Sequence, residues 1–234
     1  MKHVQFLFLI ILFAVSNANA ASRVDKRVLS PFEYISLRLS ADMQVVQGEK
    51  HYIEVTANQT TIDKIIIEVV NHKLIIRFSW EDMLFRDFDP GPIQIKVVSP
   101  RIEELSVQGS GNIFSDSEIE SYRMELNVAG SGDIQLAELN CELLEVNISG
   151  SGDIVLSNNG QTRETKVNIA GSGDLKAYQF KTEAAFIRIA GSGNCDLYVT
   201  DYLNARILGS GSLAYKGEPQ IDSNISGSGS IYHK

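Results

Sequence analysis

The stretch Asn147–Leu156 reads NISGSGDIVL, and it has close copies on either side, NVAGSGDIQL from Asn127 and NIAGSGDLKA from Asn168. The tripeptide Gly-Ser-Gly recurs at intervals of 18 to 21 residues, beginning at Gly109, Gly130, Gly150, Gly171, Gly191, Gly209 and Gly227. These copies hold 14 of the 18 glycines, so glycine marks a repeated position and not a flexible low-complexity segment. A fixed period near 20 residues is typical of a solenoid, a propeller or an array.

Apolar and polar residues alternate on both sides of each Gly-Ser-Gly. Two residues before it there is always Val or Ile, such as Ile148 and Ile169, and the residues between the apolar positions are polar or charged. A period of two indicates a strand with one buried face. After the tripeptide a further aliphatic column, including Ile134 and Ile154, indicates a second short strand. Each unit is therefore expected to be a strand, a glycine corner, a short strand and a variable loop.

Stacking of such units predicts an all-β fold. If successive units lie at the strand spacing of about 4.8 Å, each column becomes a ladder and the aliphatic columns form one continuous interior. The fold expected is a parallel β-helix or β-roll solenoid with coils of 18 to 21 residues. A propeller is the alternative, but its blades need about 40 or more residues, twice what one unit supplies.

The whole chain divides into four parts. Residues 1–20 read as a secretory signal peptide, with a basic residue, an apolar run and an Ala-Asn-Ala cleavage signature; an uncleaved membrane anchor is the alternative. Residues 21–27 are expected to be a flexible linker. Residues 28–100 suggest degenerate N-terminal β coils, with a hairpin over 65–78 and an aromatic loop over 79–92. Residues 101–234 form the Gly-Ser-Gly solenoid, continuous with 28–100 in one domain.

Composition limits the partners. The net charge of −8 argues against nucleic acid as a partner. No stretch after residue 20 is apolar enough to span a bilayer, so no transmembrane segment is expected in the mature chain. Cys141 and Cys195 lie more than two units apart, which is too far for a disulfide, and Cys195 is expected inside the core.

A column of short polar residues follows the corners. We expect these side chains to cap backbone N–H groups within each turn, as a structural turn ladder of Asn112, Asp133, Asp153, Asp174 and Asn194. The alternative is that the stacked carboxylates hold Ca²⁺. Calcium-binding glycine-aspartate repeats recur about every nine residues, however, and this period is near 20. No metal and no cofactor is therefore expected.

Two groups of aromatic and aliphatic residues are candidates for ligand contact. The first is Trp80, Met83, Phe85 and Phe88, on the loop that interrupts the N-terminal strands. Aromatic residues on a loop can stack on sugar rings or anchor a partner protein. More often, such residues fold back as a lid over an apolar edge, and this alternative is favoured here. The second group is an outer row near the C-terminal coils, made of Phe186, Tyr202 and Leu208.

The chain resembles the family described as putative auto-transporter adhesin, head GIN domain. The resemblance lies in FEYISLRLSADMQVVQG from Phe32, VVSPRIEELSVQGSGNI from Val97 and the successive GSGDI units, and it covers roughly residues 28–233. It implies a β-helical domain exported to the bacterial cell envelope with an adhesive role. It offers no catalytic residues to transfer.

These observations favour a non-catalytic binding module over an enzyme. No His, Cys and Asp cluster has the spacing of a metal or catalytic site. We expect an exported protein, in the periplasm, on the outer-membrane surface or secreted, that binds a glycan or protein ligand. The alternatives are a carbohydrate-active enzyme on a β-helix and a purely structural envelope protein. The uncovered last strand also predicts end-to-end self-association.

Overall fold

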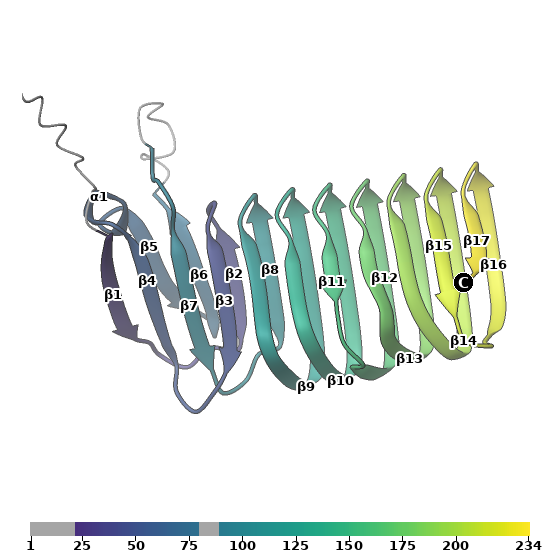
Figure 1. The fold of residues 1–234 in the computed structure, drawn as a ribbon, viewed down its shortest axis with the longest axis horizontal. Helices are drawn as coiled ribbons and strands as arrows, with labels where there is room; N and C mark the ends of the chain where they lie inside the picture. Colours follow the sequence, from purple (N-terminus) through teal and green to yellow (C-terminus); the bar gives the residue numbers. More distant parts are fainter. Residues whose placement is uncertain (1–21, 80–88) are drawn as a thin grey trace, which may run out of the picture.

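The chain folds into a β-solenoid of stacked coils (Figure 1), shown by a computed structural model that describes residues 22–79 and 89–234. One strand of each coil enters a Gly-Ser-Gly corner and another leaves it. The entering strands form the pre-corner sheet, and the leaving strands form the post-corner sheet. The expected fold class, an all-β solenoid with coils of 18 to 21 residues and an irregular N-terminal portion, is confirmed.

The coils are more continuous than the sequence suggested. Where a strand, a loop and another strand were expected, four strands run unbroken from one corner to the next and bend from one sheet into the other: β9 (Asn112–Gly130), β10 (Ile134–Gly150), β13 (Leu175–Gly191) and β14 (Asn194–Gly209). Because these strands belong to both sheets, the ladder hydrogen bonds join the whole molecule into one 17-stranded sheet.

The order of strands in the two sheets follows from the pairing. The post-corner sheet runs β1 (Ser22–Val28), β4 (Tyr52–Asn58), β7 (Gln94–Ser99), β3 (Asp42–Gln47), β9, β10, β11 (Ile154–Leu156), β13, β14, β15 (Ser212–Lys216) and β17 (Ser230–His233). The pre-corner sheet runs β5 (Ile65–Val70), β6 (Lys73–Phe78), β2 (Tyr34–Arg38), β8 (Glu104–Gly109), β9, β10, β12 (Gln161–Gly171), β13, β14 and β16 (Gln220–Gly227).

The aliphatic columns of the sequence become ladders inside the solenoid. Ile148 pairs with Val128 on one side and Ile169 on the other, and Ile134 pairs with Ile113 and Ile154. All six side chains are buried. Burial of each such aliphatic side chain contributes about 1.5–3 kcal/mol, which holds neighbouring coils together. Cys195 lies in the same interior, where it was expected.

The Gly-Ser-Gly corners align along one edge of the molecule, the upper edge in Figure 1. The first glycine of each corner has positive φ, 130° at Gly150. Its carbonyl oxygen accepts two N–H groups from the next corner, 2.8 Å from Ser172 N and 3.1 Å from Gly173 N. These backbone groups are therefore satisfied by neighbouring coils, and the repeated tripeptide is explained as a corner without any ligand.

The N-terminal portion contains one true coil and an antiparallel extension. β2 and β3 stack directly on β8 and β9, so that Asp42 pairs with Asn112 in the column of the later corners. Residues 52–78 depart from the expectation of degenerate coils, because β4 and β5 pair antiparallel with β7 and β6. The β5–β6 hairpin turns at Asn71 and His72, both with positive φ as a type I′ turn requires. A short helix, α1 (Gln59–Ile62), follows β4.

The expectation of a flexible linker at residues 21–27 is wrong for its described part. Residues 22–28 form β1, which pairs antiparallel with β4 along its whole length. The Lys26 ammonium lies 2.7 Å from the Glu54 carboxylate across this pair. The charged composition that suggested a linker is instead that of an edge strand, because exposed charges protect a sheet edge from further pairing.

The C-terminal end differs from this charged edge. Every residue of β16 is exposed, including Ile221 and Ile225, which are 41% and 42% exposed. They occupy columns whose earlier members, such as Ile207, are buried. This edge is the feature on which the expected end-to-end self-association depends.

Candidate ligand-binding surface

The aromatic loop falls outside the described part of the chain. Trp80, Met83, Phe85 and Phe88 lie within residues 80–88, and residues 1–20 lie outside it too. The site is therefore built from the outer faces of the two sheets and from the corner ladder.

The ladder of Asn112, Asp133, Asp153, Asp174 and Asn194 runs down the post-corner sheet beside the corners. Each side chain accepts a hydrogen bond from the backbone N–H of its counterpart one coil further on. Asp133 Oδ1 lies 2.8 Å from Asp153 N, and Asp153 Oδ1 lies 2.9 Å from Asp174 N. The caps therefore connect neighbouring turns, where sequence reasoning had placed them within one turn.

One cation lies over this row of carboxylates. The Lys176 ammonium is 2.5 Å from Asp153 Oδ2. The hydrogen bond to Asp153 raises the pKa of Lys176, and attraction to Asp153, Asp174 and Asp133 acts in the same direction. N–H donors and this ammonium offset the repulsion expected between stacked carboxylates. Across residues 22–79 and 89–234, no group of three or more His, Cys, Asp or Glu side chains is arranged to hold a metal ion.

Replacing Asp153 separates its acceptor role from its charge. Asp153→Ala leaves the N–H of Asp174 without its acceptor, so we expect a loss of about 1–2 kcal/mol in the free energy of unfolding. Asp153→Asn keeps an acceptor oxygen, as Asn112 and Asn194 do in the same column, and should cost under about 0.5 kcal/mol because the exposed pair with Lys176 is weak. Urea unfolding measures both, and equal losses would contradict the ladder.

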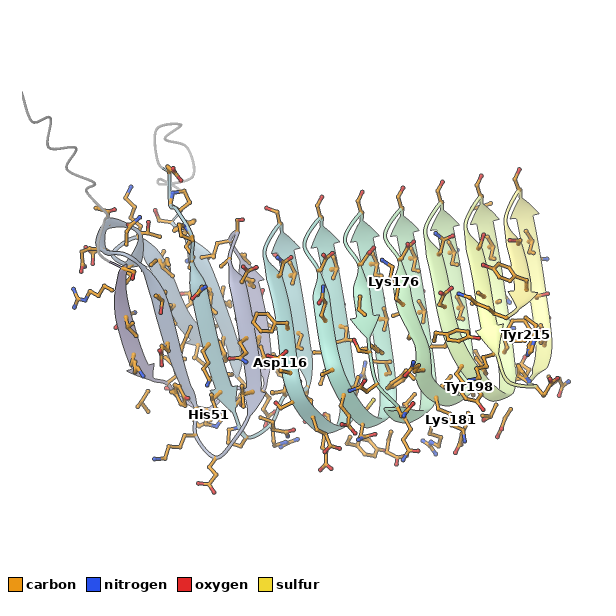
Figure 2. All side chains as sticks on the ribbon, viewed as in Figure 1. His51, Asp116, Lys176, Lys181, Tyr198 and Tyr215 are labelled. Carbon is orange, nitrogen blue, oxygen red and sulfur yellow. The ribbon has the colours of Figure 1, made fainter. Side chains whose placement is uncertain are left out.

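One serine–histidine pair has the spacing of a catalytic pair but a structural role. Ser99 Oγ lies 3.2 Å from His51 Nδ1 and 2.8 Å from the carbonyl oxygens of Phe32 and Arg101 (His51 is labelled in Figure 2). Ser99 is fully buried, and the Phe32 ring packs on the His51 ring at 5.1 Å between centroids. A substrate cannot reach this hydroxyl. The role of the pair is structural, because its hydrogen bonds join the end of β7 and the start of β4 to the segment before β2.

Neither cysteine offers a reactive thiol. Cys195 is fully buried, and burial raises the pKa of its thiol. Cys141 is half-buried, and burial raises the pKa of its thiol to about 11. Both thiols are therefore protonated and weakly nucleophilic at neutral pH.

A cleft of about 600 Å³ lies on the post-corner sheet, and we call it the polar cleft. Five neighbouring strands supply its lining: Asp42 and Gln44 from β3, Glu54 and Thr56 from β4, Gln94, Ile95 and Lys96 from β7, Asn112, Ile113 and Phe114 from β9, and Gln135 from β10, with Asp133 directly before it. The outward positions alternate with the buried core positions, so period-two strands place amides, carboxylates and one aromatic ring side by side.

Hydrogen bonds fix one side of the polar cleft. Asn112 Nδ2 donates to Asp42 Oδ1 at 2.9 Å, and Gln44 Nε2 donates to Asp116 Oδ2 at 3.1 Å. Within the described residues, the side chains of Gln94 and Gln135 have no hydrogen-bonding partner. The cleft thus combines oriented acceptors with free amide groups, the composition of a site for a polyhydroxylated ligand.

A second hollow follows the edge opposite the corners, where the long strands bend. This far-edge groove, of about 880 Å³, is lined by Glu120, Ser121, Tyr122, Asn140, Cys141, Glu142, Gln161, Thr162, Arg163, Lys181, Glu183, Thr200 and Asp201. The outer row predicted from sequence lies on the pre-corner sheet. Its Phe186 and Tyr202 rings are 6.0 Å apart, and Leu208 is 61% exposed.

The described residues thus define a β-solenoid that carries its hollows on outer sheet faces. The family model described as "Putative auto-transporter adhesin, head GIN domain" matches residues 31–219, and the chain belongs to this family. No curated protein matches the chain. No helix in the described ranges is long and apolar enough to cross a bilayer.

Solved structures share the fold. A "putative adhesin" from Bacteroides fragilis NCTC 9343 is similar at a TM-score of 0.84 and 20% identity, over 92% of this chain and 97% of that one. A "putative lipid binding protein" from Parabacteroides distasonis ATCC 8503 is 30% identical, with a TM-score of 0.76, over 92% and 98%. Family and fold together support a non-catalytic, adhesion-like role.

Proposed function

We propose that the chain is an exported, non-catalytic adhesion module that binds a glycan in the polar cleft. The observation that carries the proposal is the lining of the cleft, in which amides and carboxylates from five strands surround one aromatic ring. The signal-like pattern of residues 1–20 and the family description support export.

The chemistry of the lining suits sugars. Hydroxyl groups both donate and accept hydrogen bonds, so they pair with carboxylates such as Asp42 and with amides such as Gln94 and Gln135. Phe114 offers a flat apolar surface against which the C–H face of a pyranose ring can pack. Its neighbours on the same face are polar, so the ring is an isolated platform.

The stacking of coils suits a chain molecule. Parallel strands follow one another at about 4.8 Å, so equivalent outward side chains recur at that spacing along the solenoid axis. Asn112 and Asp133 hold the same position in successive coils, as do Phe114 and Gln135. An oligosaccharide lying across the strands would meet an outward side chain, polar or aromatic, at each successive unit.

Three alternatives bear on the same surface. The relative described as lipid binding raises a lipid ligand, but the polar lining favours hydroxyl groups over acyl chains. A protein ligand would make the same hydrogen bonds without needing the ring. A carbohydrate-active enzyme would cleave what it binds.

The test is binding of neutral oligosaccharides on a glycan array, followed by calorimetry on the tightest binder. We expect Phe114→Ala to weaken that binding about tenfold through loss of ring stacking. Arg188→Ala, at an exposed position on the pre-corner sheet, should leave the dissociation constant unchanged. New reducing ends released from the bound glycan would show an enzyme. Retention on phosphatidylcholine vesicles in place of glycans would show a lipid-binding protein.

A further inference from the structure

A third hollow lies on the post-corner sheet over the C-terminal coils, and we call it the tyrosine–lysine cavity. It measures about 390 Å³ and is lined by Asn159, Gln161, Tyr178, Gln179, Lys181, Tyr198 and Lys216. Figure 2 shows Lys181 and Tyr198 together over these coils. Tyr178 and Lys181 flank an irregular stretch of β13, where Lys181 pairs with Tyr198 of β14. Tyr198 in turn pairs with Lys216 of β15.

The aromatic rings and ammonium groups are in contact. The Lys216 ammonium lies 5.1 Å from the Tyr198 ring centroid and 5.7 Å from that of Tyr178. The Lys234 ammonium lies 5.0 Å from the Tyr178 centroid, and the Tyr178 hydroxyl donates to the backbone oxygen of Lys234 at 3.2 Å. Cation–π contacts hold Lys216 and Lys234 over the rings, and Lys216 is the one of these two that lines the cavity.

The sign of the charge sets this cavity apart. Its lining has two lysines and no carboxylate. The polar cleft has three carboxylates and one lysine. The far-edge groove, which meets this cavity at Gln161 and Lys181, has four carboxylates and two cations. The chain as a whole has a net charge of −8. A positive cavity on a negative protein attracts an anion locally while the rest of the surface repels it.

The two lysines of the cavity are also unpaired. Lys176 and Lys234 on the same face lie 2.5 Å from Asp153 and 3.4 Å from Asp196. Within the described residues, neither Lys181 nor Lys216 has a carboxylate within ion-pair distance. Their charges therefore remain available to a ligand.

We propose that the tyrosine–lysine cavity binds an anionic sugar unit of the uronic acid class. Lys181 and Lys216 would hold the ring carboxylate, Tyr198 would contact the ring face, and the amides of Asn159, Gln161 and Gln179 would pair with hydroxyls. This site shares no lining residue with the polar cleft, so it adds a charge-selective contact that does not depend on the function proposed above.

The experiment compares two ligands that differ only in charge. Calorimetry with the purified protein would use an oligogalacturonate and its fully methyl-esterified form. We expect the acid to bind at least about tenfold more tightly than the ester, because esterification removes the charge-assisted hydrogen bonds. Its affinity should fall as salt is raised. Equal affinity for acid and ester, or no binding of either at millimolar concentration, would overturn the proposal.

Variants locate the site. Lys181→Gln and Lys216→Gln should each weaken binding of the acid about tenfold. Lys166→Gln removes the same charge from an exposed position on the pre-corner sheet and should leave binding unchanged. An equal effect of all three variants would show general electrostatic attraction and no defined site. Inorganic sulfate that competes as tightly as the oligogalacturonate would show that charge alone is read and would overturn the assignment to a sugar.

Discussion

Ile169→Asp should lower the free energy of unfolding by at least about 3–5 kcal/mol, because it places a carboxylate in a filled apolar column. Ile169 is 2% exposed and pairs with Ile148 in the coil before it and with Ile189 in the coil after it. The new side chain has no buried donor there to satisfy it. Since the column is shared by three coils, we expect the loss to extend beyond one turn.

Urea unfolding followed by circular dichroism measures this loss, and Ala170→Asp is the matched control. Ala170 is the next residue and is exposed, so the same added charge should change stability by no more than about 0.5 kcal/mol. Burial should also raise the pKa of the new carboxyl, so the deficit of the Ile169→Asp variant should shrink between pH 7 and pH 4. A loss of a few tenths of a kcal/mol would mean that Ile169 does not face the interior.

The solenoid was predictable because its information is repeated. Val128, Ile148, Ile169 and Ile189 each occur two residues before a Gly-Ser-Gly, so a single alignment of the copies yields the strand, its buried face and its neighbours. Each further copy repeats the same apolar and glycine positions, so it supports the same strand and corner. Parallel in-register stacking then follows, because the aliphatic residues of each coil are buried only when a neighbouring coil packs on either side.

The N-terminal portion could not be derived in the same way because nothing in it repeats. The pattern Ser40-Ala41-Asp42-Met43 locates the one coil that stacks in register with the solenoid. The next elements depend on long-range pairing. β7 is the neighbour of β3 although more than 40 residues separate them, and β4 and β1 pair beyond it in the opposite direction. Local alternation indicates each strand but not its partner.

The polar cleft and the tyrosine–lysine cavity also differ in how far the sequence could predict them. The polar cleft brings together β3, β4, β7, β9 and β10, so its lining required the strand order of the irregular portion. The tyrosine–lysine cavity lies within the repeats, and its signal was present but missed. Tyr178, Tyr198 and Lys216 each stand four residues after the polar residue that follows a corner. Reading outward columns as carefully as inward ones would have placed them on one face.

Gly150→Ala should prevent folding or lower stability by at least about 4 kcal/mol, for two reasons that act together. Gly150 has φ of 130°, which a residue with a Cβ adopts only at a cost of about 1–2 kcal/mol. A Cβ at this position would also overlap the carbonyl oxygen of Gly130 in the preceding corner. That oxygen accepts two backbone N–H groups and cannot move away without breaking both hydrogen bonds.

Gly109→Ala separates the two effects. Gly109 has φ of 118°, so the backbone cost is similar, but a Cβ there would meet no atom within 4 Å. The preceding coil in the stack turns at Ser40-Ala41, and none of its carbonyl oxygens lies within 4 Å of a Cβ at Gly109. We therefore expect a loss of only about 1–2 kcal/mol. Thermal and urea unfolding of both variants measure the difference between their losses in stability. That difference is the cost of the overlap between the added Cβ and the neighbouring corner. Equal losses would show that the repeated glycines are required only for positive φ and not for the contact between corners.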